Sequence, residues 1–446
     1  MENQTQKRLF HLTSEVTRLF PKAGAKFFDS LILPLAGNPL LVNGVFKRNR
    51  KTLGRAPFQK ILVIPDIHIG DAVMMQGAVQ AFRDFFPEAR IDYVVKKSVV
   101  SLIEGNPAIT NLYPFFTGAV FPTEEDIQSV QKLVAENQYD LCFNCSPFFE
   151  DSRLFPKGQK MLNFMTVAPQ LLQNEKNKTG INHFLFQSYR FVEKLAEANF
   201  NIRPFESFHG VGVTLSDEAV EKATDYLREK CVPGHKPVIF LNPDTASPYT
   251  LIPLAHQSEI LKRILAMDVS VLLGTAFTHL GMEQRLLETL TAEQRQKVFV
   301  VPSTLPIDAY AALIDEADIF ISGDTGPLHI AAARKLSKSG LAEFRNKTFV
   351  ISVFGATPAR MSGYDSTNRL FPPANQDALS RTYVSESPCR NITCVNKMAK
   401  TCKDTRCFEV LNLDEMMKDI RRHLKTPSTS KIPWTNSGYL QVLRGC

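Results

Sequence analysis

The sequence predicts an α/β protein with two doubly wound parallel sheets. Three observations carry this prediction: short apolar, β-branched runs that are typical of buried parallel strands, amphipathic segments between them, and a repeat of the same alternation in the second half of the chain. A chain of 446 residues is too long for one ordinary core and suits two domains. Its 44% hydrophobic and 22% charged residues are globular values.

Positive charge is concentrated at the amino end of the chain. Residues 1–60 hold eleven Lys or Arg and three Asp or Glu, so the net charge of +7 belongs to this segment. Aromatic and aliphatic residues recur among the charges at helical spacing, which predicts a basic amphipathic arm over 1–57 on an anionic membrane surface. A solvated extension that packs loosely on the body is the alternative. No nucleic-acid-binding motif accompanies the charge, so we expect no nucleic-acid partner.

The chain lacks the apolar segments of a membrane-spanning or secreted protein. It has no uninterrupted apolar run of 18 residues, so no spanning helix is expected. No long apolar stretch follows the charges of its first ten residues, which argues against a secretory signal. These features predict a cytoplasmic protein.

The first half of the chain predicts a domain over 58–212. A strand over 60–65 is followed by a Gly-bearing loop, a helix that ends near residue 87 and a strand over 90–95. Such a strand–helix–strand unit is parallel and right-handed. Further strands are expected over 112–116 and 139–144, with a helix over 123–136 between them.

The second half predicts a similar domain over 213–425. The expected strands are 238–242, 269–274, 298–302, 319–322 and 348–354, and the expected helices are 257–267, 308–317 and 327–335. The less periodic stretch from about 200 to 236 is predicted to be a hinge. The polar segment 426–446 is expected to be a weakly ordered tail.

The strongest local motif is SGDTGPLHIAAA at residues 322–333. It follows an apolar strand and opens a helix, with Thr325 as a candidate cap and Pro327 in the first turn. Free N–H groups and the positive end of the helix dipole attract phosphate at such a start. Gly326 lets the backbone approach a ligand, and His329 is within reach of a diphosphate or ribose. An ordinary strand-to-helix turn with a satisfied histidine is the alternative.

A second motif, PDIHIGDAV, places Asp71 after the first strand. Ligands of open α/β sheets bind at the carboxyl ends of the strands, where a carboxylate can accept the proton of an attacking hydroxyl. Capping of the following helix is the alternative for Asp71. His68 is a second polar candidate in the same loop.

Three blocks, in this order, resemble the heptosyltransferase family, glycosyltransferase family 9: residues 61–95, FISGDTGPLHIAAA at 320–333 and FGATPAR at 354–360. The resemblance implies a GT-B architecture, with two Rossmann-like domains facing across a cleft. Family members transfer a heptose from ADP-heptose to the lipopolysaccharide core, inverting the anomeric centre without a metal. The implied partners are a nucleotide-sugar donor and a lipid-linked saccharide acceptor, at the inner face of the inner membrane, and no cofactor is implied.

The resemblance also implies roles for individual residues. Asp71 matches the catalytic base of the family. The residues that match the donor site lie in the C-terminal domain: Asn242, Thr245, Gly274, Asp324, Thr325, Gly326, Pro327, Leu328 and His329.

The sequence departs from the family in its donor domain. Residues 245–253 lack the Lys or Arg and the Trp that members place there, and Asp244 would repel a phosphate if it pointed inward. No acidic residue stands beside Gly274, and Glu283 is the nearest carboxylate. Arg360 is a candidate substitute cation. The open alternatives are a different donor, or a catalytically silent protein that binds nucleotide sugars.

Four late cysteines, Cys389, Cys394, Cys402 and Cys407, resemble a cysteine-rich segment of many family members. Their C-x4-C-x7-C-x4-C spacing is wider than the usual C-x2-C pairs of zinc sites, so a structural zinc is the alternative to reduced or loop-stapling cysteines. Cys142 and Cys145 are expected to be buried. A dinucleotide oxidoreductase is disfavoured, because no G-x-G-x-x-G follows the first strand.

Overall fold

The structure is a computed structural model of the chain. It describes residues 58–117, 122–149, 154–163, 188–189, 191–193, 195–196, 213–245, 250–275, 281–336, 348–355, 359–364, 380–384, 408 and 411–425. The predicted arm over 1–57, the four late cysteines and the tail over 426–446 lie outside these residues. The described chain forms two compact units, an N-terminal unit that ends at Thr214 and a C-terminal unit that comprises Leu215–Lys335 and the residues from Thr348 onward.

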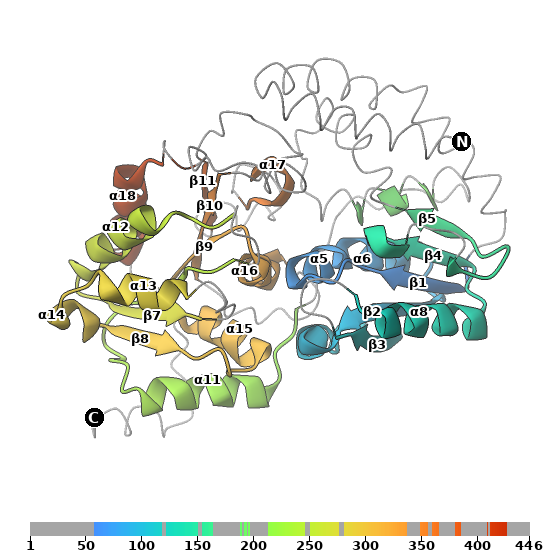
Figure 1. The fold of residues 1–446 in the computed structure, drawn as a ribbon, viewed down its shortest axis with the longest axis horizontal. Coiled ribbons are helices and arrows are strands. Elements are labelled where there is room, and N and C mark those ends of the chain that lie inside the picture. The colour runs from blue at the N-terminus through green and yellow to red at the C-terminus, as the bar shows by residue number, and fades with distance from the viewer. Residues whose placement is uncertain are drawn as a thin grey trace, which may run out of the picture. The chain divides into compact units, whose positions relative to one another are not determined.

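The N-terminal unit contains a parallel five-stranded sheet in the order β3-β2-β1-β4-β5. Its strands are β1 (Lys60–Ile64), β2 (Arg90–Lys96), β3 (Asn111–Phe116), β4 (Leu141–Asn144) and β5 (Met161–Asn163) (Figure 1). The central strands are buried on both faces, which explains their continuous apolar runs.

Helices cover both faces of this sheet. They are α5 (Ile69–Met74), α6 (Gln76–Phe85), α7 (Val100–Ile103) and α8 (Glu124–Asn137), with short 3₁₀ turns η2 (Lys97–Val99) and η3 (Pro147–Phe149). On one face, α8 packs Val130, Leu133 and Val134 against β1, β2 and β4. On the other, Phe82 of α6 meets Phe143 edge-on, with ring centroids 5.4 Å apart. The single helix predicted after the first strand is two helices divided at Met75.

The C-terminal unit contains a parallel six-stranded sheet in the order β11-β10-β9-β6-β7-β8. Its strands are β6 (Val238–Asn242), β7 (Ser270–Gly274), β8 (Val298–Val301), β9 (Ile319–Gly323), β10 (Phe349–Phe354) and β11 (Ser380–Val384). In both sheets the strand order reverses beside the first strand of the unit, between β1 and β4 and between β6 and β9. Ligands of doubly wound sheets bind at this switch point, so the carboxyl ends of these four strands are the places to search for a site.

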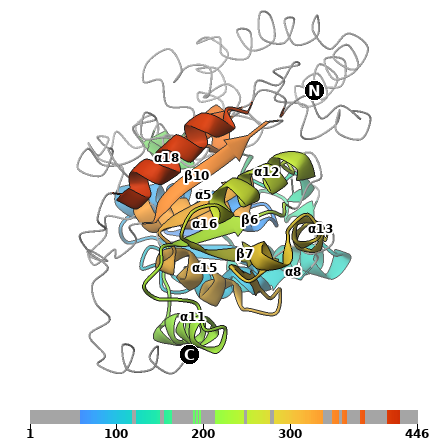
Figure 2. The same ribbon diagram turned by 90° about the vertical axis from the view of Figure 1, so that its left-hand side faces the viewer.

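The helices of the C-terminal unit also lie on both faces of its sheet. They are α11 (Asp217–Glu229), α12 (Leu254–Leu265), α13 (Met282–Glu288), α14 (Ala292–Arg295), α15 (Ile307–Glu316), α16 (Gly326–Leu336), α17 (Ala359–Ser362) and α18 (Leu413–Lys425). One core contains α12, α13 and α18 with the strand residues of that face, including Leu241 and Ile321. The opposite face is covered by α11 and α15 (Figures 1 and 2). There Tyr310 of α15 packs on Phe240 of β6, with ring centroids 4.9 Å apart.

The fold class predicted from the sequence is confirmed, but the predicted hinge is wrong in part. Helix α11 occupies Asp217–Glu229 inside that stretch, and the Ser216 hydroxyl caps it by accepting from the Ala219 N–H at 3.1 Å. The Ser-Asp-Glu start was the available signal. No helix in the described part of the chain is long and apolar enough to cross a bilayer.

One aromatic contact fixes the end of β10. The ring of Phe408 lies over Gly355, where a Cβ atom would come within 2.6 Å of the ring. The carbonyl oxygen of Phe408 is 2.6 Å from His256 Nε2 on α12. The residue directly after Cys407 is therefore held against the C-terminal sheet and its flanking helix.

Candidate functional site

The predicted base, Asp71, lies in the first turn of α5, beyond the carboxyl end of β1. The N-cap position of this helix is held by His68, whose side chain makes no capping bond, and Asp71 is the third helical residue. Asp71 is therefore not the N-cap residue of this helix. Its side chain is 33% exposed, so a substrate can approach the carboxylate.

Two further side chains of the same loop lie beside Asp71. The Nδ1 atom of His68 is 3.8 Å from Asp71 Oδ2 and 3.9 Å from Asp66 Oδ2. These distances exceed a hydrogen bond. The three ligand atoms lie within 4.8 Å of one another, a spacing that a cation could occupy, although exposed acids are commonly found this close without one. The other oxygen of Asp66 is held by the Ile67 N–H at 2.8 Å.

In the C-terminal unit, the SGDTGPLHIAAA motif forms the turn from β9 into α16, as predicted. Thr325 directly precedes the helix, and the Leu328 N–H donates to its carbonyl oxygen at 3.0 Å. The Thr325 hydroxyl is buried and has no hydrogen-bond partner among the described residues, so it does not cap the helix. Pro327 is the second helical residue, a position whose backbone N–H has no partner within a helix, so proline costs no hydrogen bond there. The side chain of Leu328 is completely buried, so Leu328 can meet a ligand only through its backbone.

His329 is only 3% exposed and has a partner at each ring nitrogen. Its Nδ1 atom is 2.9 Å from the Tyr364 hydroxyl, and its Nε2 atom is 3.4 Å from Asp324 Oδ1. Burial and the charge of Asp324 raise the pKa of the Tyr364 hydroxyl well above its ordinary value, so the tyrosine stays neutral. The geometry favours the satisfied-histidine alternative, in which His329 orients Asp324, and a direct donor contact of His329 stays a prediction.

Asn242, at the end of β6, ties the two switch-point strands together. Its Nδ2 donates to Ser322 Oγ of β9 and to the carbonyl oxygen of Asp244, both at 3.0 Å, and its Oδ1 accepts from the Tyr310 hydroxyl at 2.9 Å. Asn242 is 1% exposed, and these bonds engage both ends of its amide. Asn242 therefore shapes the β6 loop, while a direct contact with the donor stays a prediction.

Two glycines of the site lie in close packing. At Gly274, a Cβ atom would lie 2.2 Å from the Tyr310 hydroxyl oxygen, which fills the space above the end of β7. At Gly323, a Cβ atom would lie 3.3 Å from the carbonyl oxygen of Thr250 and 3.6 Å from Thr245 Cγ2. The loop after β6 thus lies directly against the start of the β9–α16 motif. The packing of Tyr310 is enough to explain why glycine occupies position 274, without any contact with a ligand.

Asp244, which the sequence predicts to repel phosphate, points into the protein. It is 0% exposed, and neither carboxyl oxygen makes a hydrogen bond of normal geometry with the described residues, among which the Met282 backbone N–H is the donor that acts on it. Burial and the nearby Glu283 carboxylate raise the pKa of Asp244 to about 7, against a smaller opposing effect of the Met282 backbone N–H. Asp244 is therefore a group that changes charge near neutral pH.

The predictions for Arg360 and for the cysteines of the N-terminal unit have different outcomes. Arg360 lies on α17, but its side chain is outside the described atoms, so its role as a substitute cation stays a prediction. Cys142 and Cys145 are buried free thiols, as expected, and burial raises the pKa of both. They are inert at neutral pH in this setting.

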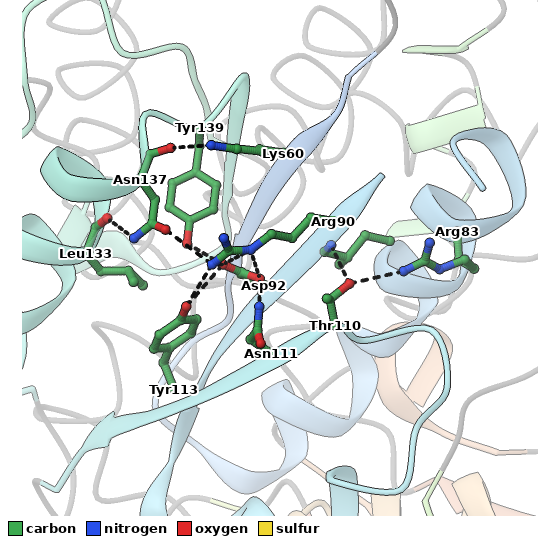
Figure 3. Close-up of polar contacts among 11 residues, drawn as sticks. Lys60, Arg83, Arg90, Asp92, Thr110, Asn111, Tyr113, Leu133, Asn137 and Tyr139 are labelled. Atoms are coloured by element: carbon green, nitrogen blue, oxygen red, sulfur yellow. Dashed lines mark hydrogen bonds and ion pairs between the residues drawn. The ribbon is translucent and has the colours of Figure 1, made fainter. Parts of the chain in front are cut away.

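The sequence analysis missed a polar network around Asp92 in β2 (Figure 3). Arg90 Nη2 donates to Asp92 Oδ2 at 2.7 Å, and the Tyr139 hydroxyl donates to the same oxygen at 2.6 Å. Asn111 Nδ2 donates to Oδ1 at 2.8 Å, and the Tyr113 hydroxyl lies 3.3 Å from Oδ2. Asp92 is near the amino end of its strand, away from the ligand edge, so the network is structural. An aspartate inside the apolar run RIDYVV was the available signal.

Comparisons with known proteins cover parts of the chain. Residues 195–400 match the family model of glycosyltransferase family 9 (heptosyltransferase). A Haemophilus influenzae protein with a provisional description as a glycosyltransferase is 24% identical over 296 residues, which cover 63% of this chain and 82% of that protein.

Two solved structures share the fold. The family 9 glycosyl transferase of Veillonella parvula has a TM-score of 0.60 at 15% identity, and the alignment covers 82% of this chain and 97% of that one. The ADP-heptose LPS heptosyltransferase II of E. coli has a TM-score of 0.51 at 14% identity, with 82% and 98% covered. The match to the family model includes the β9–α16 motif on which the resemblance depended. Residues 195–400 are therefore similar to glycosyltransferase family 9, and the chain is a glycosyltransferase.

Proposed function

We propose that the protein transfers a heptose, or a related sugar, from an ADP-sugar to a lipid-linked saccharide such as the lipopolysaccharide core. The observation that carries the proposal is the family 9 match over 195–400, because these residues include β6, β9 and the start of α16. The three elements meet at the switch point of the C-terminal sheet, where a nucleotide-sugar fits.

The proposed reaction is a single displacement. The Asp71 carboxylate takes the proton of the acceptor hydroxyl while that oxygen bonds to the anomeric carbon of the donor sugar. The bond from the anomeric carbon to the diphosphate oxygen breaks, and its electron pair leaves with the diphosphate. Attack on one face and departure from the other invert the anomeric centre. The step uses no metal ion, and this too is part of the proposal.

The C-terminal unit offers groups that suit the leaving diphosphate. Thr325 contributes a hydroxyl without a partner in the described structure, and the first N–H groups of α16 face its amino end. Asp324, which His329 orients, is partly exposed beside them and suits a hydroxyl of the donor. Hydrogen-bond donors fixed before the reaction stabilise developing charge without reorganisation.

A second candidate function is silent binding of nucleotide sugars. It is favoured by one observation: residues 242–253 contain no Lys or Arg, while Asp244 brings a carboxyl into the same loop. Losing one charge-assisted phosphate contact costs about 1.5–3 kcal/mol. Such a protein would bind the donor without turning it over.

One assay separates the two functions. The protein is incubated with ADP-heptose and heptose-deficient lipopolysaccharide, and ADP release is measured. Transfer predicts release that Asp71→Asn lowers by about 100-fold or more, with nucleotide-sugar binding unchanged. Asp66→Asn, in the same loop, is the matched control and should retain most of the activity. Binding without release in the unaltered protein would instead assign the silent function.

The donor nucleotide can be identified separately. A thermal-shift series with ADP-, GDP- and UDP-sugars should show the largest stabilisation with the true donor, because a ligand that binds the folded state raises its apparent stability. A larger shift with a GDP- or UDP-sugar would contradict the ADP assignment and leave the transferase activity intact.

The basic segment 1–57 supports a proposal about location. We infer that it holds the enzyme at the anionic, cytoplasmic surface of the inner membrane, where a lipid-linked acceptor would lie. Deleting residues 1–50 should weaken cosedimentation with phosphatidylglycerol vesicles, and the binding of the full chain should fall steeply with added salt. Equal binding by both proteins would contradict the proposal.

A further inference from the structure

Buried oxygens without partners gather at one edge of the C-terminal sheet. Eight side-chain atoms in the described part of the chain are buried without a hydrogen-bond partner, and five of them belong to Asp244, Gln257, Glu283 and Thr325. Asp244 follows β6, Glu283 lies in the first turn of the helix after β7, and Thr325 follows β9. Native proteins leave few buried polar atoms without a hydrogen-bond partner. A cluster of such atoms at the ligand edge of the sheet therefore indicates that a bound ligand would supply their partners.

The loop that carries Asp244 is held rigidly by its backbone. Its carbonyl oxygen accepts from Asn242 Nδ2 at 3.0 Å, and the carbonyl oxygen of the preceding Pro243 accepts from Gln257 Nε2, also at 3.0 Å. The next residue, Thr245, lies against Gly323 at the start of the β9–α16 motif. The backbone of Asp244 is therefore held one residue from that motif, and its buried carboxyl lies where Glu283 and the Met282 N–H of α13 act on it.

The groups that act electrostatically on Asp244 favour its neutral form. Glu283 of α13 is a second carboxylate, and the Tyr310 hydroxyl of α15, whose pKa burial raises well above its ordinary value, is neutral. The N–H of Met282 is the one opposing group. No Lys or Arg lies within residues 242–253. Two neighbouring acids without a cation hold a proton more tightly than either would alone.

We propose that Asp244 is a positioning residue that must be a neutral carboxylic acid when the nucleotide-sugar diphosphate binds, with Glu283 as the neighbour that keeps it protonated. The proposal rests on the proposed function, since it concerns the same donor site. An ionised Asp244 would place a negative charge beside the diphosphate in a poorly hydrated setting, where repulsion is strong. A neutral Asp244 removes that repulsion. Donor binding would then be linked to the uptake of a proton by Asp244.

The test is the pH dependence of binding by the full chain. ADP-glucose is titrated calorimetrically between pH 6 and 8.5, with GDP- and UDP-glucose in parallel, because their diphosphates have no group that titrates in this range. Since burial and Glu283 bring the pKa of Asp244 to about 7, the dissociation constant should rise above pH 7 by about tenfold per pH unit. Repeating the titration in buffers of different ionisation enthalpy should show uptake of up to about one proton.

Two conservative variants separate this role from a structural one. Asp244→Asn is neutral at every pH, so its binding should be as tight as that of the unaltered protein at pH 6 and flat up to pH 8.5. Glu283→Gln removes the neighbouring charge, so binding should begin to weaken at a lower pH than in the unaltered protein. The second variant also keeps the test decisive if the first does not fold.

Several results would overturn the inference. A flat pH profile in the unaltered protein, or an unchanged slope in Asp244→Asn, would show that Asp244 does not carry the proton. Binding that requires added Mg²⁺ and ignores pH would assign the two acids to a cation instead. In each case the donor would still bind, so the proposed function would survive. Failure of all three nucleotide sugars to bind at any pH would remove the proposed function as well.

Discussion

Asp92 and Asp244 are both 0% exposed, yet their surroundings are opposite. Asp92 lies near the amino ends of the strands of its sheet and receives hydrogen bonds from an arginine, an asparagine and two tyrosines. Asp244 lies beyond the carboxyl end of β6, beside another acid, and has no hydrogen-bond partner in the described structure. The first arrangement surrounds a buried carboxyl with hydrogen-bond donors, and the second leaves a buried carboxyl beside a second acid. A buried acid indicates function when its partners are missing, not when it is merely buried.

The largest effect is expected from breaking the satisfied network. Asp92→Ala leaves the Arg90 guanidinium and the Tyr139 hydroxyl without their shared acceptor, so it should lower the free energy of unfolding by about 3–5 kcal/mol. Urea unfolding of the two proteins at pH 7 measures this difference. Asp92→Asn, which keeps an acceptor oxygen, should lose less. A loss below about 1 kcal/mol in the alanine variant would mean that the network is not stabilising.

The opposite sign is expected at Asp244. In the folded chain burial and Glu283 raise its pKa to about 7 from an ordinary value of 3.8, so the folded state binds the proton more tightly than the unfolded state. Stability should therefore fall as pH rises from about 4 to 7 and change no further above 7 because of this group. Asp244→Asn should be more stable than the unaltered protein by about 2–4 kcal/mol at pH 8.

Measuring the same substitution at a lower pH provides the control. The advantage of Asp244→Asn should shrink by more than half at pH 5. The aspartic acid is then neutral in the folded state, so the remaining cost is that of protonating a carboxyl about one pH unit above its ordinary pKa of 3.8. Chemical unfolding at pH 5 and pH 8 gives both values. A variant that is less stable than the unaltered protein at pH 8 would show that the Asp244 carboxylate has partners after all.

A smaller effect tests how the donors of Asp92 differ. Tyr139→Phe removes a hydroxyl that donates to Asp92 Oδ2 at 2.6 Å in a buried setting, so it should cost about 1.5–3 kcal/mol of unfolding free energy. Tyr113→Phe is the matched control, because its hydroxyl is 3.3 Å from the same oxygen and is only partly buried. Equal costs would mean that bond length and burial do not rank these contacts.

The smallest stability effect is expected at the hydroxyl without a partner. Thr325→Val replaces a buried hydroxyl that makes no hydrogen bond in the described structure. The free energy of unfolding should therefore stay unchanged or rise by up to about 1 kcal/mol. The control is Thr348→Val, since the Thr348 hydroxyl donates to two carbonyl oxygens at 2.8 and 2.9 Å and its loss should destabilise. Thr325→Val should nevertheless weaken nucleotide-sugar binding in the thermal-shift assay. Unchanged binding would remove Thr325 from the donor site.

The sequence was most informative where local chemistry decides the structure. Strand β6 matches its prediction at both ends, and α16 begins within one residue of its predicted start, because apolar β-branched runs and a Gly-Pro helix start carry their own signals. Strand β11, with the polar sequence SRTYV, carries no such signal and was missed. Helix α18 was also missed, although acids in its first turn and bases in its last turn suit the helix dipole.

The positions of the candidate site residues were predictable from the sequence, but their burial and their neighbours were not. The sequence placed Asp71, Thr325 and His329 at the carboxyl ends of strands, which the structure bears out. It could not show that Tyr364 encloses His329, or that Glu283 acts on Asp244, since these neighbours are separated by more than 30 residues along the chain. Burial and long-range pairing depend on the packed sheet, and these two properties decide which acids titrate.

The contact between Gly355 and Phe408 has a consequence for natural variation in this protein. A side chain at 355 would occupy the volume of the ring, so the two positions should change together, with a small residue at one accompanying an aromatic ring at the other. Because the ring follows directly after Cys407 and Gly355 is the second residue of the FGATPAR segment, a change at one position that is not matched at the other should disturb the packing at the end of β10.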